Sequence, residues 1–262
     1  MNILDTIIAQ KKAEVKKRKR QTSIAELEKG PFFKNETLSF SKFLKDETRS
    51  GIIAEFKRRS PSKGIINNTS TVTDVTTAYA RYGASGISIL TDEDFFGGSL
   101  NDLLAATINE VPLLRKDFII DEYQLIESKA FGAEVILLIA ACLTKTEVKK
   151  LAIFAKNTGL NVLLEIHNDE ELEHICDHVD VVGVNNRDLK TFTVDINRSI
   201  QLSKKIPADK IKISESGIDD VAAIKLLKQN GFSGFLMGEK FMKEKDPGEA
   251  FKNFTQELNR EK

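Results

Sequence analysis

Short apolar runs alternate with amphipathic helical stretches from Gly51 to the end of the chain. The runs at 135–139 and 162–164 are continuously apolar, which is typical of parallel strands covered by helices. Strands are predicted at 52–57, 86–90, 112–116, 134–139, 161–166, 180–184, 211–214 and 234–237. Helices are predicted at 72–82, 99–109, 121–131, 145–158, 168–177, 195–205, 219–229 and 246–259. Eight strand–helix units in a row favour an α/β fold, a closed (β/α)8 TIM barrel, over an open doubly wound sheet.

Glycine positions support these boundaries. Gly83, Gly132, Gly159 and Gly231 stand where glycines that end helices in the left-handed conformation belong. No Gly-x-Gly-x-x-Gly motif follows the first predicted strand, which weakens a dinucleotide-binding fold.

The first fifty residues are predicted to form a helical extension. A helix over 3–19 carries an apolar stripe, a short helix follows at 22–29, and a third segment precedes Gly51. The basic run at 16–20 would suit an RNA-binding arm or a transit peptide, but acidic neighbours favour a solvated helix face. We therefore expect residues 1–50 to pack as an extension on a barrel of residues 51–262.

Composition narrows the class of protein. The chain has 262 residues, of which 41% are hydrophobic and 30% charged, and its formal net charge is +0. This charge gives no general attraction to nucleic acid or to a membrane. No apolar run is long enough to span a bilayer, and Cys142 and Cys176 are too few for a disulfide framework. We expect a soluble cytoplasmic protein that binds neither nucleic acid nor membrane.

The end of the first predicted strand carries candidate chemistry. Glu55 and Lys57 are two residues apart and therefore share one face of the strand, and a loop rich in Ser, Pro and Gly follows. Catalytic residues of α/β barrels lie at such strand ends. The alternative is an ion pair at the surface.

Other strand ends carry polar residues as well. Lys116, Glu165, Asn185 and Glu239 would meet Glu55 and Lys57 at one end of the barrel, where the charges would perturb one another's pKa values. A purely structural network of ion pairs is the alternative. His167 falls one residue off the strand face and is interpreted as a supporting or structural residue.

The last two strand ends indicate an anion site. Ser216 and Gly217 follow the seventh strand, and Gly238 and Glu239 follow the eighth. Small residues before helices let backbone N–H groups approach a phosphate, and barrels often bind phosphate at this place. The alternative is that these glycines only make tight turns.

His174 and His178 are spaced like a pair of metal ligands. They lie on a polar stretch that leads into the sixth strand, away from the strand ends. A solvated helix end is therefore preferred to a metal site, and no metal is predicted.

Seven motifs in order resemble those of the indole-3-glycerol phosphate synthase family of tryptophan biosynthesis, and the resemblance covers essentially the whole chain. The motifs are the stretches 53–62, 90–99, 114–118, 163–165, 183–189, 214–218 and 236–239. The resemblance implies a cofactor-free lyase acting on 1-(2-carboxyphenylamino)-1-deoxyribulose 5-phosphate. Ring closure with loss of carbon dioxide and water would give indole-3-glycerol phosphate by general acid and base catalysis.

The resemblance also implies roles for individual residues. Lys116 would be the general acid of ring closure, Lys57 would bind substrate anions and share the acid role, Glu165 would serve the dehydration, and Glu55 would orient the lysines. Asn185 and Arg187 would position the substrate. The phosphate end would comprise Ser60, Ser216, Gly217, Gly238 and the backbone N–H of Glu239. The anthranilate pocket would comprise Phe118, Leu137, Leu189 and one of Phe95 and Phe96.

Two alternative functions and the expected binding partners complete the hypothesis. Phosphoribosylanthranilate isomerase is the nearest alternative enzyme. A resemblance to that family would require a Cys near the first strand end, where this chain has Glu55 and Lys57. A barrel that binds ligand without turnover is the other alternative. The expected partner is the phosphorylated small-molecule substrate, and other tryptophan-pathway enzymes are candidate partners.

Overall fold

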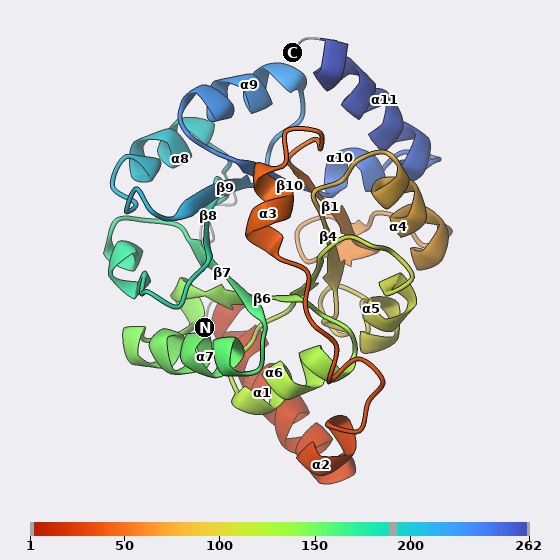
Figure 1. Ribbon diagram of the computed structural model, residues 1–262, viewed down its shortest axis with the longest axis vertical. Coiled ribbons are helices and arrows are strands. Elements are labelled where there is room, and N and C mark those ends of the chain that lie inside the picture. Colours follow the sequence, from red (N-terminus) through yellow and green to blue (C-terminus); the bar gives the residue numbers. More distant parts are fainter. Residues whose placement is uncertain (1–2, 189–192, 261–262) are drawn as a thin grey trace.

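Eight parallel strands close into a barrel in the computed structural model, which describes residues 3–188 and 193–260 (Figure 1). Their order within this described part is β1-β10-β9-β8-β7-β6-β5-β4. The bounds are β1 Ile52–Phe56, β4 Gly86–Leu90, β5 Leu113–Lys116, β6 Val135–Ile139, β7 Asn161–Ile166, β8 Val181–Asn185, β9 Ile211–Glu215 and β10 Gly234–Met237. Because β1 pairs with both β4 and β10, the sheet has no open edge. The prediction of a (β/α)8 barrel is confirmed, and the alternative of an open doubly wound sheet is excluded.

Helices cover the outside of the barrel between successive strands. They are α4 Val72–Arg81, α5 Leu100–Ala106, α6 Glu122–Ala130, α7 Lys145–Asn157, α8 Ile196–Ser203, α9 Val221–Gln229, α10 Glu239–Met242 and α11 Pro247–Arg260, with short 3-10 helices η1 Ala140–Cys142 and η2 Glu170–His174. The glycines predicted to end helices all have positive φ, which confirms their role: Gly83, Gly132, Gly159 and Gly231.

The prediction of an α-helix at 168–177 is wrong, since this segment contains only the 3-10 helix η2. The carboxylate of Glu171 accepts the backbone N–H of His167 at 2.7 Å and the side-chain amide of Asn168 at 3.1 Å. Local bonds of this kind compete with a regular helix.

Apolar side chains of alternate residues fill the barrel. Ile53, Leu114, Leu163, Ile213 and Leu236 belong to this interior cluster. Phe40 and Leu44 join it from α3 (Phe40–Lys45), which lies across one end of the barrel (Figure 1). The interior is therefore a packed core, and a cavity opens at the other end.

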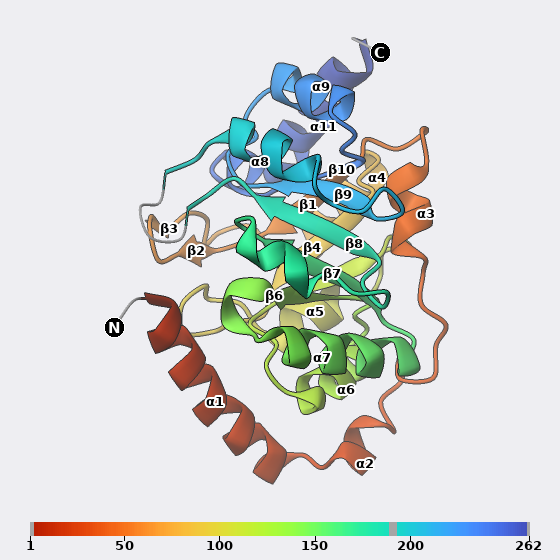
Figure 2. The same ribbon diagram turned by 90° about the vertical axis from the view of Figure 1, so that its left-hand side faces the viewer.

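Two helices and a connecting segment lead to α3. Helix α1 (Ile3–Gln21) packs beside α6, with Ile7, Lys11 and Val15 buried, and α2 (Ile24–Leu27) follows. Figure 2 shows the start of α1 at the barrel end opposite α3. The division of the chain at residue 50 stays a prediction.

Most of the basic run at 16–20 is exposed, as the solvated-face interpretation expects. Arg18 is half-buried and pairs with Glu127 at 3.0 Å, and Lys19 pairs with Asp121 at 2.7 Å, so two of its charges fasten α1 to the barrel. Within residues 3–188 and 193–260, no helix has the length and apolar character needed to cross a bilayer.

The loop after β1 is a small hairpin of β2 (Arg59–Ser60) and β3 (Gly64–Ile65). It lies at the same end of the barrel as the start of α1 (Figure 2). Its base is fixed by Arg58, which donates to both carboxylate oxygens of Asp102 at 2.6 and 2.8 Å. Ile65, which pairs with Arg59, is 69% exposed, so the hairpin adds little to the core.

Candidate active site

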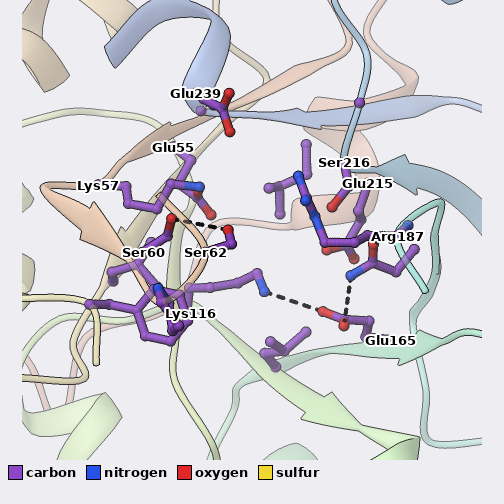
Figure 3. A pocket seen from close by; sticks show the side chains of 18 of the residues that line it. Glu55, Lys57, Ser60, Ser62, Lys116, Glu165, Arg187, Glu215, Ser216 and Glu239 are labelled. Atoms are coloured by element: carbon purple, nitrogen blue, oxygen red, sulfur yellow. Dashed lines mark hydrogen bonds and ion pairs between the residues drawn. The ribbon is translucent and has the colours of Figure 1, made fainter. Parts of the chain in front are cut away.

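A cavity of about 470 Å³ opens where the strands end at their carboxyl termini. It brings together all predicted site residues that the structure describes: Glu55, Lys57, Ser60, Lys116, Phe118, Leu137, Glu165, Asn185, Arg187, Ser216, Gly217, Gly238 and Glu239. Leu189 lies outside the described residues. Several of these side chains are drawn in Figure 3.

Strand geometry explains why the polar residues converge. Lys116 shares its face with Leu114, Glu165 with Leu163, and Asn185 with Val181, and these apolar residues point into the barrel. Successive residues of a strand point to opposite faces, so each polar residue points inward one step beyond the packed core. The barrel interior thus continues from an apolar core into a polar cavity.

Glu55 and Lys57 form one ion pair at the end of β1. The Lys57 ammonium lies 2.7 Å from Glu55 Oε1, and the Glu55 side chain is buried while that of Lys57 is 17% exposed. Gly238 lies against this carboxylate, and a Cβ there would come within 2.8 Å of the Glu55 Cβ. Gly238 is therefore required by the packing of Glu55, and a larger residue would disturb the ion pair as well as any anion site.

Lys116 reaches across the cavity from β5 to β7 (Figure 3). Its ammonium lies 3.2 Å from Glu165 Oε2, and the amide of Asn185 donates to Glu165 Oε1 at 3.0 Å. Burial acts to lower the pKa of Lys116, but Glu165, Glu215 and Glu55 outweigh it and raise this pKa above its ordinary value. Lys116 is therefore protonated at neutral pH and surrounded by carboxylates.

Glu165 is held in its ionised form. Burial acts to raise the pKa of Glu165, but Lys116, His167 and Asn185 together lower it well below its usual range. An ionised carboxylate beside a protonated amine supplies a base and an acid in one cavity.

His167 supports Glu165 from behind. Its Nε2 lies 3.1 Å from Glu165 Oε1 without hydrogen-bond geometry, so this contact is electrostatic, and its Nδ1 lies 3.2 Å from Glu171 Oε2. Burial acts to lower the pKa of His167, yet the two carboxylates raise it to about 10. This arrangement agrees with the expected supporting role.

Glu215 is a cavity residue that the sequence prediction omitted. Its carboxylate is buried and lies over Gly183, where a Cβ would come within 2.2 Å of Oε1, and this oxygen has no hydrogen-bond partner in the described structure. Burial and the nearby Glu165 raise the pKa of Glu215 to about 8, against the lowering effect of Lys116. The signal was present in the sequence, because Glu215 shares strand parity with Ile211 and Ile213.

The predicted phosphate end is as expected only in part: Gly238 caps the helix α10, but Ser216 and Gly217 do not lead directly into a helix. Ser216 and Gly217 have positive φ values of 69° and 66°, and α9 begins only at Val221 after its cap Asp220. Their N–H groups therefore belong to a left-handed turn and are not at a helix start. Backbone amides in such turns can still form an anion-binding concavity.

Positive side chains surround this end of the cavity. Lys63, Arg187 and Lys240 line it together with Lys57. Lys63 pairs with Glu239, which connects the hairpin to the end of β10. The Glu239 side chain is thus committed to Lys63, and only its backbone N–H is available to an anion, as expected.

The opposite wall of the cavity is aromatic and apolar. The rings of Phe96 and Phe118 lie 6.3 Å apart at an angle of 39°, and Leu137 lies nearby in the same wall. Of the two candidates, Phe96 lines the cavity and Phe95 does not. Ile3, Leu4 and Ile7 of α1 also line it, a contribution that the sequence did not establish.

The histidine pair lies away from the cavity. His174 contacts the backbone carbonyl oxygens of Leu143 at 3.0 Å and Glu171 at 3.2 Å. Among residues 3–188 and 193–260, no group of His, Cys, Asp and Glu side chains is arranged to hold a metal ion.

Comparison with known proteins gives consistent matches. A family model described as indole-3-glycerol phosphate synthase matches residues 4–254. An indole-3-glycerol phosphate synthase of Bacteroides thetaiotaomicron is 47% identical over 258 residues, covering 98% of this chain and 99% of that protein. The one of Alkaliphilus metalliredigens is 42% identical over 260 residues, covering 98% and 99%.

Two solved structures of low sequence identity share the fold. Tryptophan synthase subunit alpha from Legionella pneumophila aligns with a TM-score of 0.62 at 13% identity, covering 84% of this chain and 97% of that one. The 3-hexulose-6-phosphate synthase of Salmonella typhimurium aligns with a TM-score of 0.60 at 13% identity, covering 80% and 99%.

Proposed function

The chain belongs to the indole-3-glycerol phosphate synthase family, and from this premise we propose which residues of the cavity perform each step. The enzyme is a carboxy-lyase of tryptophan biosynthesis. It converts 1-(2-carboxyphenylamino)-1-deoxyribulose 5-phosphate into indole-3-glycerol phosphate, carbon dioxide and water.

Lys116 is the general acid of ring closure. The aryl carbon that bears the carboxylate attacks the ketone carbon, a C–C bond forms, and the carbonyl oxygen takes a proton from the Lys116 ammonium. A raised pKa keeps this ammonium protonated until the alkoxide develops. Lys57 follows β1, binds the substrate anions and shares the acid role.

Loss of carbon dioxide follows without a further proton transfer. The bond between the ring and the carboxylate breaks, and its electron pair returns to the ring, which becomes aromatic again. The apolar wall of Phe96, Phe118 and Leu137 favours this step, because a carboxylate loses charge as it leaves as a neutral molecule.

Dehydration needs one acid and one base. The hydroxyl made in the first step leaves as water after taking a proton, and a proton is then removed from the adjacent carbon to form the indole double bond. Glu165 is ionised and serves as the base. Glu215 is largely protonated at neutral pH and is the structure's additional candidate for the acid.

Different residues of the cavity bind the phosphate and orient the rest of the substrate. Arg187, Ser60 and the turn at Ser216 and Gly217 bind the phosphate with the backbone of Gly238 and Glu239, while Asn185 orients Glu165 and the substrate. Arg187 is itself placed by its backbone N–H, which donates to Asn185 Oδ1 at 3.0 Å. We place the enzyme in the cytoplasm, and docking with other tryptophan-pathway enzymes stays a prediction.

The observation that carries these assignments is the contact of Lys116 with Glu165 across the cavity, 3.2 Å from ammonium to carboxylate. The test is to mix the purified protein with the substrate and follow indole fluorescence. The chain contains no Trp, so the product signal rises over a weak tyrosine background. Binding of the substrate without any fluorescence increase would indicate a binding protein and refute the catalytic assignments.

A further inference from the structure

Lys11 is a buried cation that the reaction does not use. It lies on α1, and its side chain is only 1% exposed. Its ammonium lies 2.7 Å from Glu14 Oε2, 2.9 Å from Asp92 Oδ2 and 2.9 Å from Asp117 Oδ1, although the directions to these oxygens lie outside hydrogen-bond geometry. A buried ammonium is tolerated only when carboxylates surround it in this way.

Two of these carboxylates come from the ends of neighbouring strands. Asp92 follows β4 and Asp117 follows β5, whereas Glu14 is on α1 itself. Lys11 thus joins three separate elements at one point. Burial acts to lower the pKa of Lys11, but Asp117, Asp92 and Glu14 raise it, so the link is charged at any physiological pH.

Each aspartate also holds the backbone of a turn that carries an aromatic residue. Asp92 Oδ1 accepts the N–H of Phe95 at 2.8 Å, and Asp117 Oδ1 accepts the N–H of Phe118 at 2.8 Å. The first turn places Phe96 and the second places Phe118, and these two rings form the aromatic wall of the cavity.

The remaining oxygen of Asp117 is fully engaged. Its Oδ2 accepts from Thr91 at 2.7 Å and from Arg115 at 2.9 Å. Only Lys11 among these partners comes from outside the two strand ends, and it is the group that connects Asp117 to Asp92. Thr91 and Asp117 link the two strand ends directly, and the Lys11 ammonium is a further link that ties the aspartates of both aromatic turns to the N-terminal helix.

We propose that Lys11 is a positioning residue that fixes the aromatic wall, and with it the aryl end of the substrate. This inference rests on the proposed function in that it takes the wall to be where the aryl group binds. Most of the phosphate end follows β8, β9 and β10, whereas the strand-end carboxylates that Lys11 pairs with follow β4 and β5. Lys11 should therefore control one end of the substrate site and leave the other unchanged.

The test measures the two ends separately, with anthranilate as a probe of the aromatic wall and inorganic phosphate as a probe of the other end. Both are used as competitive inhibitors of turnover by the full-length enzyme. In Lys11→Met, the inhibition constant of anthranilate is expected to rise about tenfold or more, since small misplacements carry large costs. That of phosphate is expected to stay within about twofold.

Val15→Ala is the matched control. Val15 is buried on the same helix, in an apolar cluster with Tyr123 and Ile126. This variant loosens α1 and lowers the melting temperature through a cavity, yet it should leave both inhibition constants unchanged. Equal losses for anthranilate in both variants would overturn the proposal, because general attachment of α1 would then explain the effect.

Removal of Lys11 alone leaves two buried aspartates facing each other, so a milder variant is needed if Lys11→Met does not fold. Asp92→Asn keeps the acceptor for the Phe95 N–H and leaves Lys11 two carboxylates. This variant should raise the inhibition constant of anthranilate by about threefold or more and leave that of phosphate unchanged. An unchanged anthranilate constant in a folded variant refutes the proposal. Absence of phosphate inhibition in the parent would instead refute the phosphate assignment alone.

Discussion

Replacement of Lys116 by Met tests the acid of ring closure most directly. Methionine keeps much of the length and the apolar stem of lysine but removes the ammonium that lies 3.2 Å from Glu165. General acid catalysis typically contributes about 10²–10⁴-fold in rate. At 1.36 kcal/mol per factor of ten, this corresponds to about 2.7–5.4 kcal/mol in the activation free energy.

Lys116→Met should remove the general acid and leave the general base Glu165 in place. In Lys116→Met, Glu165 loses its nearest cation, and its pKa rises toward the ordinary value, but His167 and Asn185 still stabilise its charge. The base of the dehydration therefore persists at neutral pH. For the same reason the destabilisation should be smaller than the roughly 3–5 kcal/mol seen when a buried ion pair loses one partner.

The assay is steady-state kinetics by product fluorescence, with a thermal melt and product binding for each variant. Lys116→Met should lose kcat by at least about 10²-fold and still fold and bind product. Lys57→Met is the comparison, since it leaves Lys116 in place but unpairs Glu55, and it should raise KM as well. If Lys116→Met kept kcat within a few-fold of the parent, the acid would be another group, and Lys57 would be the first candidate.

Three further outcomes are expected. Ser60→Ala should raise KM by about tenfold with little effect on melting, because it removes one hydroxyl donor to the charged phosphate; an unchanged KM and unchanged phosphate inhibition would contradict the assignment of Ser60 to the phosphate site. Activity should fall as pH rises through about 8, where Glu215 ionises, and this limb should vanish from the pH–rate profile of Glu215→Gln. The pKa of Glu215 is raised in the folded state from its ordinary 4.5. Its contribution to stability is therefore fully present below pH 4.5 and is lost as pH rises through about 8, which thermal melts of the parent and of Glu215→Gln would reveal. Amide exchange of residues 58–68 should slow when product binds, since the hairpin has few buried contacts; equal exchange in both states would argue against a gating role.

Periodicity along the chain was sufficient to predict the barrel. Continuous apolar runs separated by helical stretches leave few arrangements, and glycines such as Gly83 and Gly159 mark helix ends through local backbone energetics. The same strand parity predicted that Glu55, Lys57 and Lys116 would meet at one end. Glu215 could have been added by this rule, since it follows Ile211 and Ile213 on one face.

The protonation states and the aromatic wall were decided only by tertiary structure. The pKa of Glu215 depends on burial beside Glu165, a residue from another strand, and no local pattern encodes that distance. Likewise, the choice of Phe96 over Phe95 depends on the turn from Asp92 to Phe95, in which Asp92 accepts the N–H of Phe95.

Lys11 illustrates the limit of sequence periodicity most clearly. In the sequence it stands four residues after Ile7 and four before Val15, on the apolar stripe of the helix, but no local pattern identifies its partners. Its burial follows from the way α1 lies across the ends of β4 and β5, where Asp92 and Asp117 are 81 and 106 residues further along the chain. Charge interactions depend on distance in space, and only the folded chain places each aspartate 2.9 Å from the Lys11 ammonium.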